Sequence, residues 1–294
     1  MRQPSVPDVD LAFSRVSVGE VALHVALAGP EDGEPFVLLH GFPEFWWGWR
    51  RQIPGLVAAG YRVIAPDQRG YNLSDKPRGA SAYGARRLAG DVAALIAATC
   101  PDGRAHLVGH DWGGVVAFAV GALHPERLRS LSVLNAPSLA VAGDYARRHP
   151  SQALKSSYVG VFQAPVLPEI ALSAGGYRAM RRALVGSSRR GTFSAADLAI
   201  YADAWAQPGA LTGMLNWYRG LTRAPARLEG MRVPVRTQVL WGARDRFLEM
   251  GLARASVALC DHGRLDVFDD ATHWIHLEEP EAVTGRLVAF FKAG

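Results

Sequence analysis

The sequence has few cysteines, no long apolar run and no serine-hydrolase motif. Cys100 and Cys260 are its only cysteines in 294 residues, too few for a disulfide framework and without metal-ligand spacing. The longest uncharged apolar stretch, residues 112–123, is shorter than the roughly 20 residues that span a bilayer. The N-terminal segment MRQPSVPDVDLAF has no basic region followed by an apolar one. We therefore expect a cytoplasmic protein with no signal peptide and no membrane insertion.

Long runs of like charge are also absent. The chain has 32 basic residues, mostly arginine, against 27 acidic ones, for a formal net charge of +5. These charges are scattered, and no tract of five or six like charges occurs. A nucleic-acid partner is therefore not expected.

Apolar runs alternate with helix-like patterns along most of the chain, which predicts an α/β protein. Segments 13–18 and 21–27 meet at a Gly-Glu turn and predict a hairpin. Apolar residues at helical spacing follow in 88–96 and 283–291. Six further short runs have the length and composition of strands in a mostly parallel sheet, which makes eight strands in total: 36–39, 62–65, 105–108, 131–134, 235–240 and 264–268.

Strand signals vanish between about residue 138 and residue 223, where Arg, Tyr, Trp, Gly and Pro accompany helix-like stretches. Such a stretch predicts a helical cap inserted over the carboxyl ends of the strands, where open α/β sheets bind ligands. We therefore expect core segments at 1–137 and 223–294 and a cap at 138–222.

The hexapeptide Gly-His-Asp-Trp-Gly-Gly at 109–114 follows one predicted strand directly and precedes an apolar helix. This is the sequence form of a nucleophile elbow, in which glycines flank a residue held in a strained turn. Asp111 stands at the nucleophile position, and no G-x-S-x-G occurs in the chain. An ionised carboxylate can displace a leaving group from saturated carbon and remain as an ester. The alternative is a plain glycine-rich strand-to-helix turn.

An acid and then a histidine are expected later in the chain. Asp245 ends the predicted strand in WGARD, and His273 follows the next strand in DATHW. His273 would act as the general base, and Asp245 would orient it. The loop after strand 131–134 reads Asn-Ala-Pro and offers no carboxylate. Asp245 as a turn cap, or His273 with His276 as a metal pair, remain the alternatives.

An oxyanion hole needs two backbone N–H groups, one after the nucleophile and one in the loop after the third strand. Trp112 supplies the first, and Phe42 in His-Gly-Phe-Pro-Glu supplies the second. The same loop is one that accommodates a cis bond before Pro43.

Several segments together resemble the motif set of the α/β-hydrolase-fold epoxide hydrolases, which is similar to that of haloalkane dehalogenases. These segments extend from the third strand almost to the C-terminus: HGFPEFWWGWR, DQRGYNLSDKP, GHDWGG, LNWYRG, WGARD and ATHWIHLEEP. The resemblance implies an α/β-hydrolase fold and two cap tyrosines that grip the epoxide oxygen. By position these are Tyr158 and Tyr218. Asn72 replaces a glycine that is common in relatives, at a turn position where a left-handed conformation suits asparagine.

Acid–base chemistry supports the two tyrosines independently. Opening an epoxide creates a strongly basic alkoxide, and a phenol can donate its proton while staying protonated at rest. A cap tyrosine can instead serve only for packing. Trp46, Trp47 and Trp217 are candidates for lining an apolar pocket.

The sequence thus predicts hydrolysis of a small apolar epoxide to a vicinal diol through an ester on Asp111, with no cofactor or metal. A haloalkane dehalogenase would share the nucleophile but commonly has asparagine at the position of Phe42. A haloacid dehalogenase would need an arginine at the position of Trp112. A noncatalytic small-ligand binder is the remaining class, and a homodimer is an option that the sequence leaves open.

Overall fold

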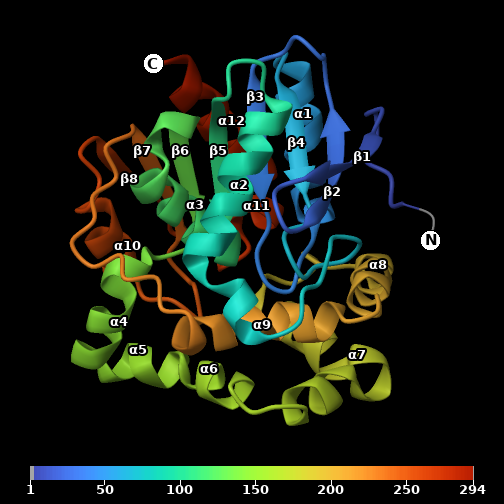
Figure 1. Ribbon diagram of the computed structural model, residues 1–294, viewed down its shortest axis with the longest axis vertical. Coiled ribbons are helices and arrows are strands. Elements are labelled where there is room, and N and C mark those ends of the chain that lie inside the picture. The colour runs from blue at the N-terminus through green and yellow to red at the C-terminus, as the bar shows by residue number, and fades with distance from the viewer. Residues whose placement is uncertain (1–2, 294) are drawn as a thin grey trace.

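The structure, a computed structural model that describes residues 3–293, contains one sheet with helices on both faces and a helical layer across one end (Figure 1). The eight strands follow the order β1-β2-β4-β3-β5-β6-β7-β8. β1 and β2 pair antiparallel, as do β2 and β4, and the remaining pairs are parallel. The strand bounds are β1 (Ala12–Ser17), β2 (Ala22–Ala28), β3 (Pro35–Leu39), β4 (Arg62–Pro66), β5 (Ala105–His110), β6 (Leu128–Leu134), β7 (Thr237–Gly242) and β8 (Gly263–Phe268).

The predicted sheet is confirmed, including the opening hairpin. The predicted strand at 235–240 lies two residues later, because the ladder between β7 and β8 runs from Thr237 to Gly242. The central strands β3 and β5 are buried along their whole length. Continuous apolar runs without alternation are what a strand covered on both faces requires.

The core helices lie on the two faces of the sheet. In Figure 1, α2 and α3 lie in front of the strands and α12 lies behind them. The bounds of these helices are η1 (Trp46–Trp49), α1 (Ile53–Ala58), η2 (Ala80–Tyr83), α2 (Ala85–Thr99), α3 (Trp112–Leu123), η3 (Pro125–Arg127), α10 (Met250–Val257), α11 (Ile275–Glu278) and α12 (Pro280–Lys292). The helical patterns predicted at 88–96 and 283–291 belong to α2 and α12.

Six helices in succession form the inserted cap, which covers one end of the sheet (Figure 1). Within α7, residues 174–177 leave helical geometry, and Gly175 and Gly176 take left-handed φ angles of 59° and 68°. α7 is therefore two helical pieces joined by a bend. The cap helices are α4 (Leu139–Arg148), α5 (Pro150–Lys155), α6 (Ser157–Phe162), α7 (Leu167–Ser187), α8 (Ala195–Trp205) and α9 (Ala210–Arg223).

Within residues 3–293, no helix is both long enough and apolar enough to cross a bilayer.

Candidate active site

Asp111 occupies the tight turn between β5 and α3, in a strained conformation with φ 50° and ψ −122°. Neighbouring side chains would not fit this turn. A Cβ on Gly109 would lie 2.3 Å from the carbonyl oxygen of Gly113, and one on Gly113 would lie 2.2 Å from the carbonyl oxygen of Leu39. The glycines are therefore required by backbone contact, and the turn has the geometry predicted for a nucleophile elbow.

The loop after β3 places a backbone donor on the Asp111 carboxylate. The Phe42 N–H donates to Asp111 Oδ1 at 2.8 Å. A Cβ on Gly41 would lie 2.5 Å from the Cβ of Asp111, so glycine permits this close approach. The Phe42–Pro43 peptide is cis, as the loop sequence allowed. Trp112 begins α3, and its N–H is one of the first-turn donors that have no acceptor within their own helix.

His273 and Asp245 lie beside Asp111. His273 Nδ1 is 2.8 Å from Asp245 Oδ2, and His273 Nε2 is 3.4 Å from Asp111 Oδ2. Asp245 is buried, and its second oxygen accepts from the N–H groups of Phe247 and Leu248 at 2.7 and 3.0 Å. Asp111, Asp245 and His273, which the sequence predicted as nucleophile, acid and base, therefore lie together in one cluster.

The charges of this cluster follow from its contacts. Burial alone would lower the pKa of His273, but Asp245 and Asp111 on either side raise it to about 10. Burial would raise the pKa of Asp245, but the charge and hydrogen bond of His273 hold it below its usual range. At neutral pH His273 therefore rests as an imidazolium between Asp245 and Asp111.

Asn135 also binds Asp245, and sequence reasoning did not identify it. Its Nδ2 donates to Asp245 Oδ2 at 2.7 Å, and its Oδ1 accepts from the Gly242 N–H at 2.9 Å. Asn135 comes from the loop after β6, which had been set aside because it contains no carboxylate. The sequence feature that indicates this role is the Asn135 side-chain amide, whose N–H can donate to a carboxylate while its oxygen accepts from a backbone N–H.

The two predicted cap tyrosines lie together over Asp111. Tyr158 belongs to α6 and Tyr218 to α9, and their ring centroids are 5.9 Å apart. The Tyr218 ring also packs edge-on against the Trp112 ring, with centroids 5.1 Å apart. Burial, reinforced by the Asp111 charge, raises the pKa of both phenols, so both are protonated at rest.

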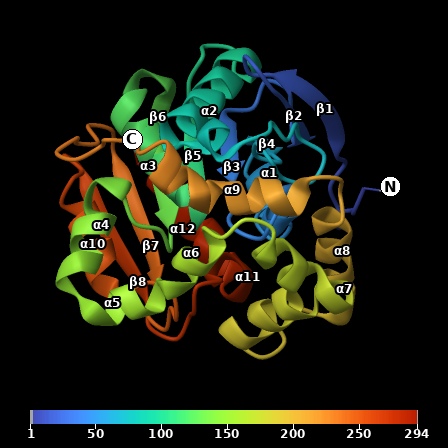
Figure 2. The same cartoon turned by 60° about the horizontal axis from the view of Figure 1, so that its bottom comes forward.

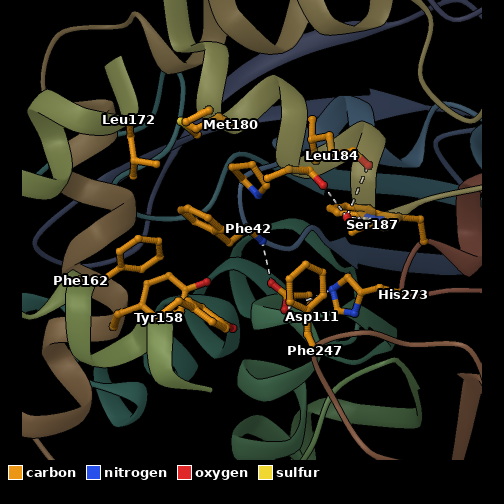
Figure 3. Close-up of a pocket in the computed structure, with 15 residues that line it drawn as sticks. Phe42, Asp111, Tyr158, Phe162, Leu172, Met180, Leu184, Ser187, Phe247 and His273 are labelled. Atoms are coloured by element: carbon orange, nitrogen blue, oxygen red, sulfur yellow. Dashed lines mark hydrogen bonds and ion pairs between the residues drawn. The ribbon is translucent and has the colours of Figure 1, made fainter. Parts of the chain in front are cut away.

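These groups line a cavity of about 250 Å³. Figure 3 shows Asp111 with Phe42, Tyr158 and His273 around it. The remainder of the wall is almost entirely apolar and comes mostly from the cap: Phe162, Leu172, Met180, Leu184, Phe247 and Trp274. A few convergent polar groups in an apolar cavity are typical of a small-molecule site.

The three tryptophans predicted to line the pocket lie outside this cavity, and that prediction is wrong. Trp46 is fully buried in the core, and the Trp47 indole donates to the carbonyl oxygen of Ser5 at 3.2 Å. The Trp217 indole donates to the carbonyl oxygen of Arg69 at 2.9 Å and lies behind Trp112. The indole N–H groups of Trp47 and Trp217 therefore hydrogen-bond within the packed protein and not toward the cavity. The indole N–H of Trp46 has no hydrogen-bond partner among the described atoms.

A second buried cluster lies beneath the nucleophile, and the sequence argument did not find it. Glu44, His110 and His276 bring ligand-type atoms within 4.8 Å of one another. Glu44 Oε2 is 3.0 Å from His110 Nδ1, and Glu44 Oε1 is 3.2 Å from His276 Nε2. His276 thus faces this cluster, and the alternative of a metal pair with His273 is wrong. The signal was in motifs already noted, since Glu44 ends HGFPE and His110 precedes Asp111.

Hydrogen bonding sets the charge of this cluster. His110 Nε2 lies 2.9 Å from the carbonyl oxygen of His273, an acceptor only, so that nitrogen carries a proton. Burial would raise the pKa of Glu44, but His276 and His110 hold it well below its usual range. His110 therefore links the Glu44 carboxylate to the backbone of His273 beside the elbow.

Comparisons with known proteins agree with this fold. Residues 34–280 match the family model of the alpha/beta hydrolase fold. AB hydrolase superfamily protein YfhM of Bacillus subtilis is 45% identical over 277 residues, which cover 94% of this chain and 96% of that protein. Epoxide hydrolase A of Mycobacterium tuberculosis is 34% identical, with 94% and 95% covered. The crystal structure of Bacillus megaterium epoxide hydrolase in complex with an inhibitor has a TM-score of 0.86 and 25% identity, covering 95% of this chain and 100% of that one.

The family match and the sheet order define an α/β hydrolase with a helical insert. Within that class the chain belongs to the epoxide hydrolase family, and the resemblance predicted from its motifs is confirmed.

Proposed function

We propose that the protein hydrolyses an epoxide to a vicinal diol through a hydroxyalkyl ester on Asp111. The observation that carries this proposal is a carboxylate at a nucleophile elbow facing two protonated phenols across an apolar cavity. A nucleophile on one side and proton donors on the other are what ring opening of an uncharged epoxide needs.

In the first step, Asp111 attacks the less hindered epoxide carbon. Oδ1 accepts from the Phe42 N–H, whereas Oδ2 has only the longer 3.4 Å contact with His273 Nε2, so Oδ2 forms the new C–O bond. As the ring C–O bond breaks, its electron pair goes to the epoxide oxygen, which takes a proton from Tyr158 or Tyr218. Esterification removes the Asp111 charge that helps to hold the proton on His273. That proton then passes, through water in the cavity, to restore the tyrosine.

In the second step, neutral His273 takes a proton from a water molecule while the oxygen of that water attacks the ester carbonyl carbon. The Phe42 and Trp112 N–H groups stabilise the oxyanion. Collapse breaks the bond to the alkyl oxygen, and the departing alkoxide takes the proton of the new carboxyl group. The diol leaves, and His273 is again an imidazolium beside the carboxylate.

Haloalkane dehalogenation is less well supported by the site. A departing halide takes no proton and is stabilised by free N–H donors. The Phe42 side chain has no donor, and the Tyr158 and Tyr218 hydroxyls in the cavity suit a leaving oxygen that must be protonated. A haloacid substrate would need a cation where Trp112 stands. A purely binding role leaves the strain at Asp111 without a purpose.

The proposal is tested by offering styrene-type, alicyclic and long-chain epoxides beside 1-bromobutane. We expect diol from at least one epoxide and no bromide. Bromide release without diol would overturn the proposal in favour of dehalogenation, and no product from any of these substrates would favour a binding protein.

Removing the tyrosine hydroxyls should slow ring opening. Tyr158→Phe and Tyr218→Phe should each lower its single-turnover rate by roughly 10-fold to 1000-fold, the range for loss of a transition-state hydrogen bond. The double variant should be nearly inactive. Tyr177→Phe, a cap tyrosine outside the cavity, is the control. Wild-type rates for Tyr158→Phe with an impaired Tyr218→Phe would contradict the role of Tyr158.

The two steps should differ in pH dependence. In the free protein the pKa of His273 is raised to about 10, in part by Asp111, so the protonated form persists through neutral pH. Ester formation needs no base and should be nearly constant as pH rises toward that value. In the ester the Asp111 charge is gone, so the pKa of His273 must fall. Rapid-quench mass spectrometry should show ester hydrolysis rising with pH and levelling off below the free-protein pKa. A pH-independent hydrolysis step would contradict this assignment of His273.

A further inference from the structure

The outer layer of the cap exposes an unusual amount of apolar surface. Figures 1 and 2 show α5, α6 and α7 on the side of the cap turned away from the sheet. Of eight large apolar side chains that are exposed among residues 3–293, six lie on or beside these helices. We call this set the outer cap face: Leu154, Val161, Val166, Leu167, Ile170 and Val185. Clustered exposure of this kind marks an interaction surface, whereas single exposed residues do not.

The centre of the outer cap face presents no free charge. Between Lys155 and Arg178 the chain contains one acidic or basic residue, Glu169. Glu169 is bound by both terminal nitrogens of Arg219, at 2.7 and 2.9 Å, and its side chain is 18% exposed. Val166, Leu167 and Ile170 are in contrast 62%, 69% and 60% exposed.

The cap carries an excess of positive charge. Residues 139–223 contain 10 basic and 4 acidic residues, whereas the rest of the chain contains 22 and 23. The whole excess of positive charge therefore lies in the cap. Arg178, Arg181 and Arg182 follow one another at helical spacing in the second piece of α7, where they line a shallow hollow with Val185 and with Leu198 of α8.

The acidic residues of the cap do not neutralise these arginines. Asp144 pairs with Arg147 and Arg148, and Asp197 pairs with Arg50 of the core. Glu169 is taken by Arg219. Arg178 and Arg182 are exposed, and neither forms an ion pair with a carboxylate among the described residues.

The cavity opens beside the same surface. Ala179 and Ala183 line the cavity and are also exposed to solvent, whereas Met180 and Leu184, one residue further on each time, are buried in its wall. The mouth therefore lies along α7, directly next to Arg178 and Arg182 in the sequence.

We propose that the outer cap face docks onto an anionic phospholipid surface. Residues 161–170 would rest among the headgroups and upper acyl chains, and Arg178 and Arg182 would pair with phosphates. The mouth at Ala179 and Ala183 would then face the lipid, so an apolar epoxide dissolved there could reach Asp111 without crossing water. Only this last consequence rests on the proposed function.

Charge favours lipid over a second copy of the chain. Two outer cap faces related by a two-fold axis would bring like-charged arginines together. Of the cap carboxylates, all except Asp203 are already in ion pairs and cannot offset this repulsion. Anionic lipid supplies the missing counter-charge and also covers the apolar centre.

The test is sedimentation of the full chain with vesicles, without substrate. Vesicles of phosphatidylcholine alone are compared with vesicles of roughly equal parts phosphatidylcholine and phosphatidylglycerol. Wild-type protein should bind the mixed vesicles, less at high salt. The triple change Val166→Ser, Leu167→Ser, Ile170→Ser should weaken binding at least ~10-fold. The control is Phe13→Ser with Val267→Ser, the two exposed apolar residues of the core, which should bind as wild type.

A charge pair completes the design. Arg178→Gln with Arg182→Gln should weaken binding by roughly 10-fold to 30-fold, whereas Arg78→Gln with Arg254→Gln removes the same charge from exposed core positions and should have little effect. Absence of wild-type binding, or equal loss in cap and core variants, would overturn the proposal. So would a wild-type dimer that the triple change converts to monomer while vesicle binding stays the same. The cap variants should hydrolyse a water-soluble epoxide at the wild-type rate. A loss of vesicle binding can therefore be distinguished from a failure of the proposed hydrolase activity.

Discussion

Asp111→Asn should abolish diol formation while the protein remains folded. The amide is close in shape to the carboxylate, and its oxygen can still accept from the Phe42 N–H that is now 2.8 Å from Oδ1. It is, however, a very poor nucleophile, so the rate should fall on the order of a millionfold, the scale seen when a catalytic nucleophile is removed. Steady-state assays with the best epoxide of the panel, with intact mass and thermal unfolding checked in parallel, would measure this.

The control for that variant is Asp270→Asn, which removes an exposed carboxylate three residues before His273. Its activity should be that of wild type. Retained activity in Asp111→Asn, in protein shown by mass to be free of deamidation, would mean that Asp111 is not the nucleophile.

The charge on His273 should also respond to this substitution. Asp111 is one of the two carboxylates that raise the pKa of His273 to about 10, so its loss must lower that pKa. NMR titration of the His273 ring in wild type and Asp111→Asn would show the shift directly. An unchanged pKa would mean that Asp245 alone holds the proton.

The sheet and the elbow could be predicted from the sequence because they depend on local pattern. Buried strands such as β3 need continuous apolar runs, and the elbow needs glycines at positions 109 and 113, where any Cβ would meet backbone. These requirements act over a few residues, so they are visible in the linear chain.

The pocket tryptophans could not be predicted in the same way. An aromatic side chain near a motif can pack toward the cavity or away from it, and the side is decided by tertiary contacts. The Trp47 indole hydrogen-bonds the Ser5 carbonyl oxygen, 42 residues away in the chain. The Trp217 indole hydrogen-bonds the Arg69 carbonyl oxygen, 148 residues away. No local pattern encodes either partner.

The network beneath the nucleophile was missed for a related reason. Glu44, His110 and His276 come from three distant segments, and only the fold brings them together. Asn135 lies in a loop without a carboxylate, and its side-chain amide instead holds the carboxylate of Asp245. An amide in such a loop carries no pattern that identifies its partner 110 residues away.

His273→Gln should separate the two chemical steps. Ester formation requires Asp111 and the tyrosines but no general base, so this variant should open one epoxide and then stall with the hydroxyalkyl ester on Asp111. Glutamine can still hydrogen-bond Asp245, which keeps the buried acid partnered. His262→Gln, which changes an exposed histidine, is the control and should turn over normally.

Intact mass of His273→Gln after exposure to substrate should rise by one whole substrate mass, because an epoxide has no leaving group. An alkyl halide would add its mass less that of the hydrogen halide, so the same measurement also distinguishes the two chemistries. In wild type given a single turnover in heavy-oxygen water, the new diol oxygen should come from Asp111, and the label should appear in its carboxylate. If His273 instead activates water to attack the epoxide directly, the variant forms no adduct and the label enters the first diol. That pattern would refute the covalent mechanism and leave Asp111 an electrostatic role, with the imidazolium of His273 as its resting counter-ion.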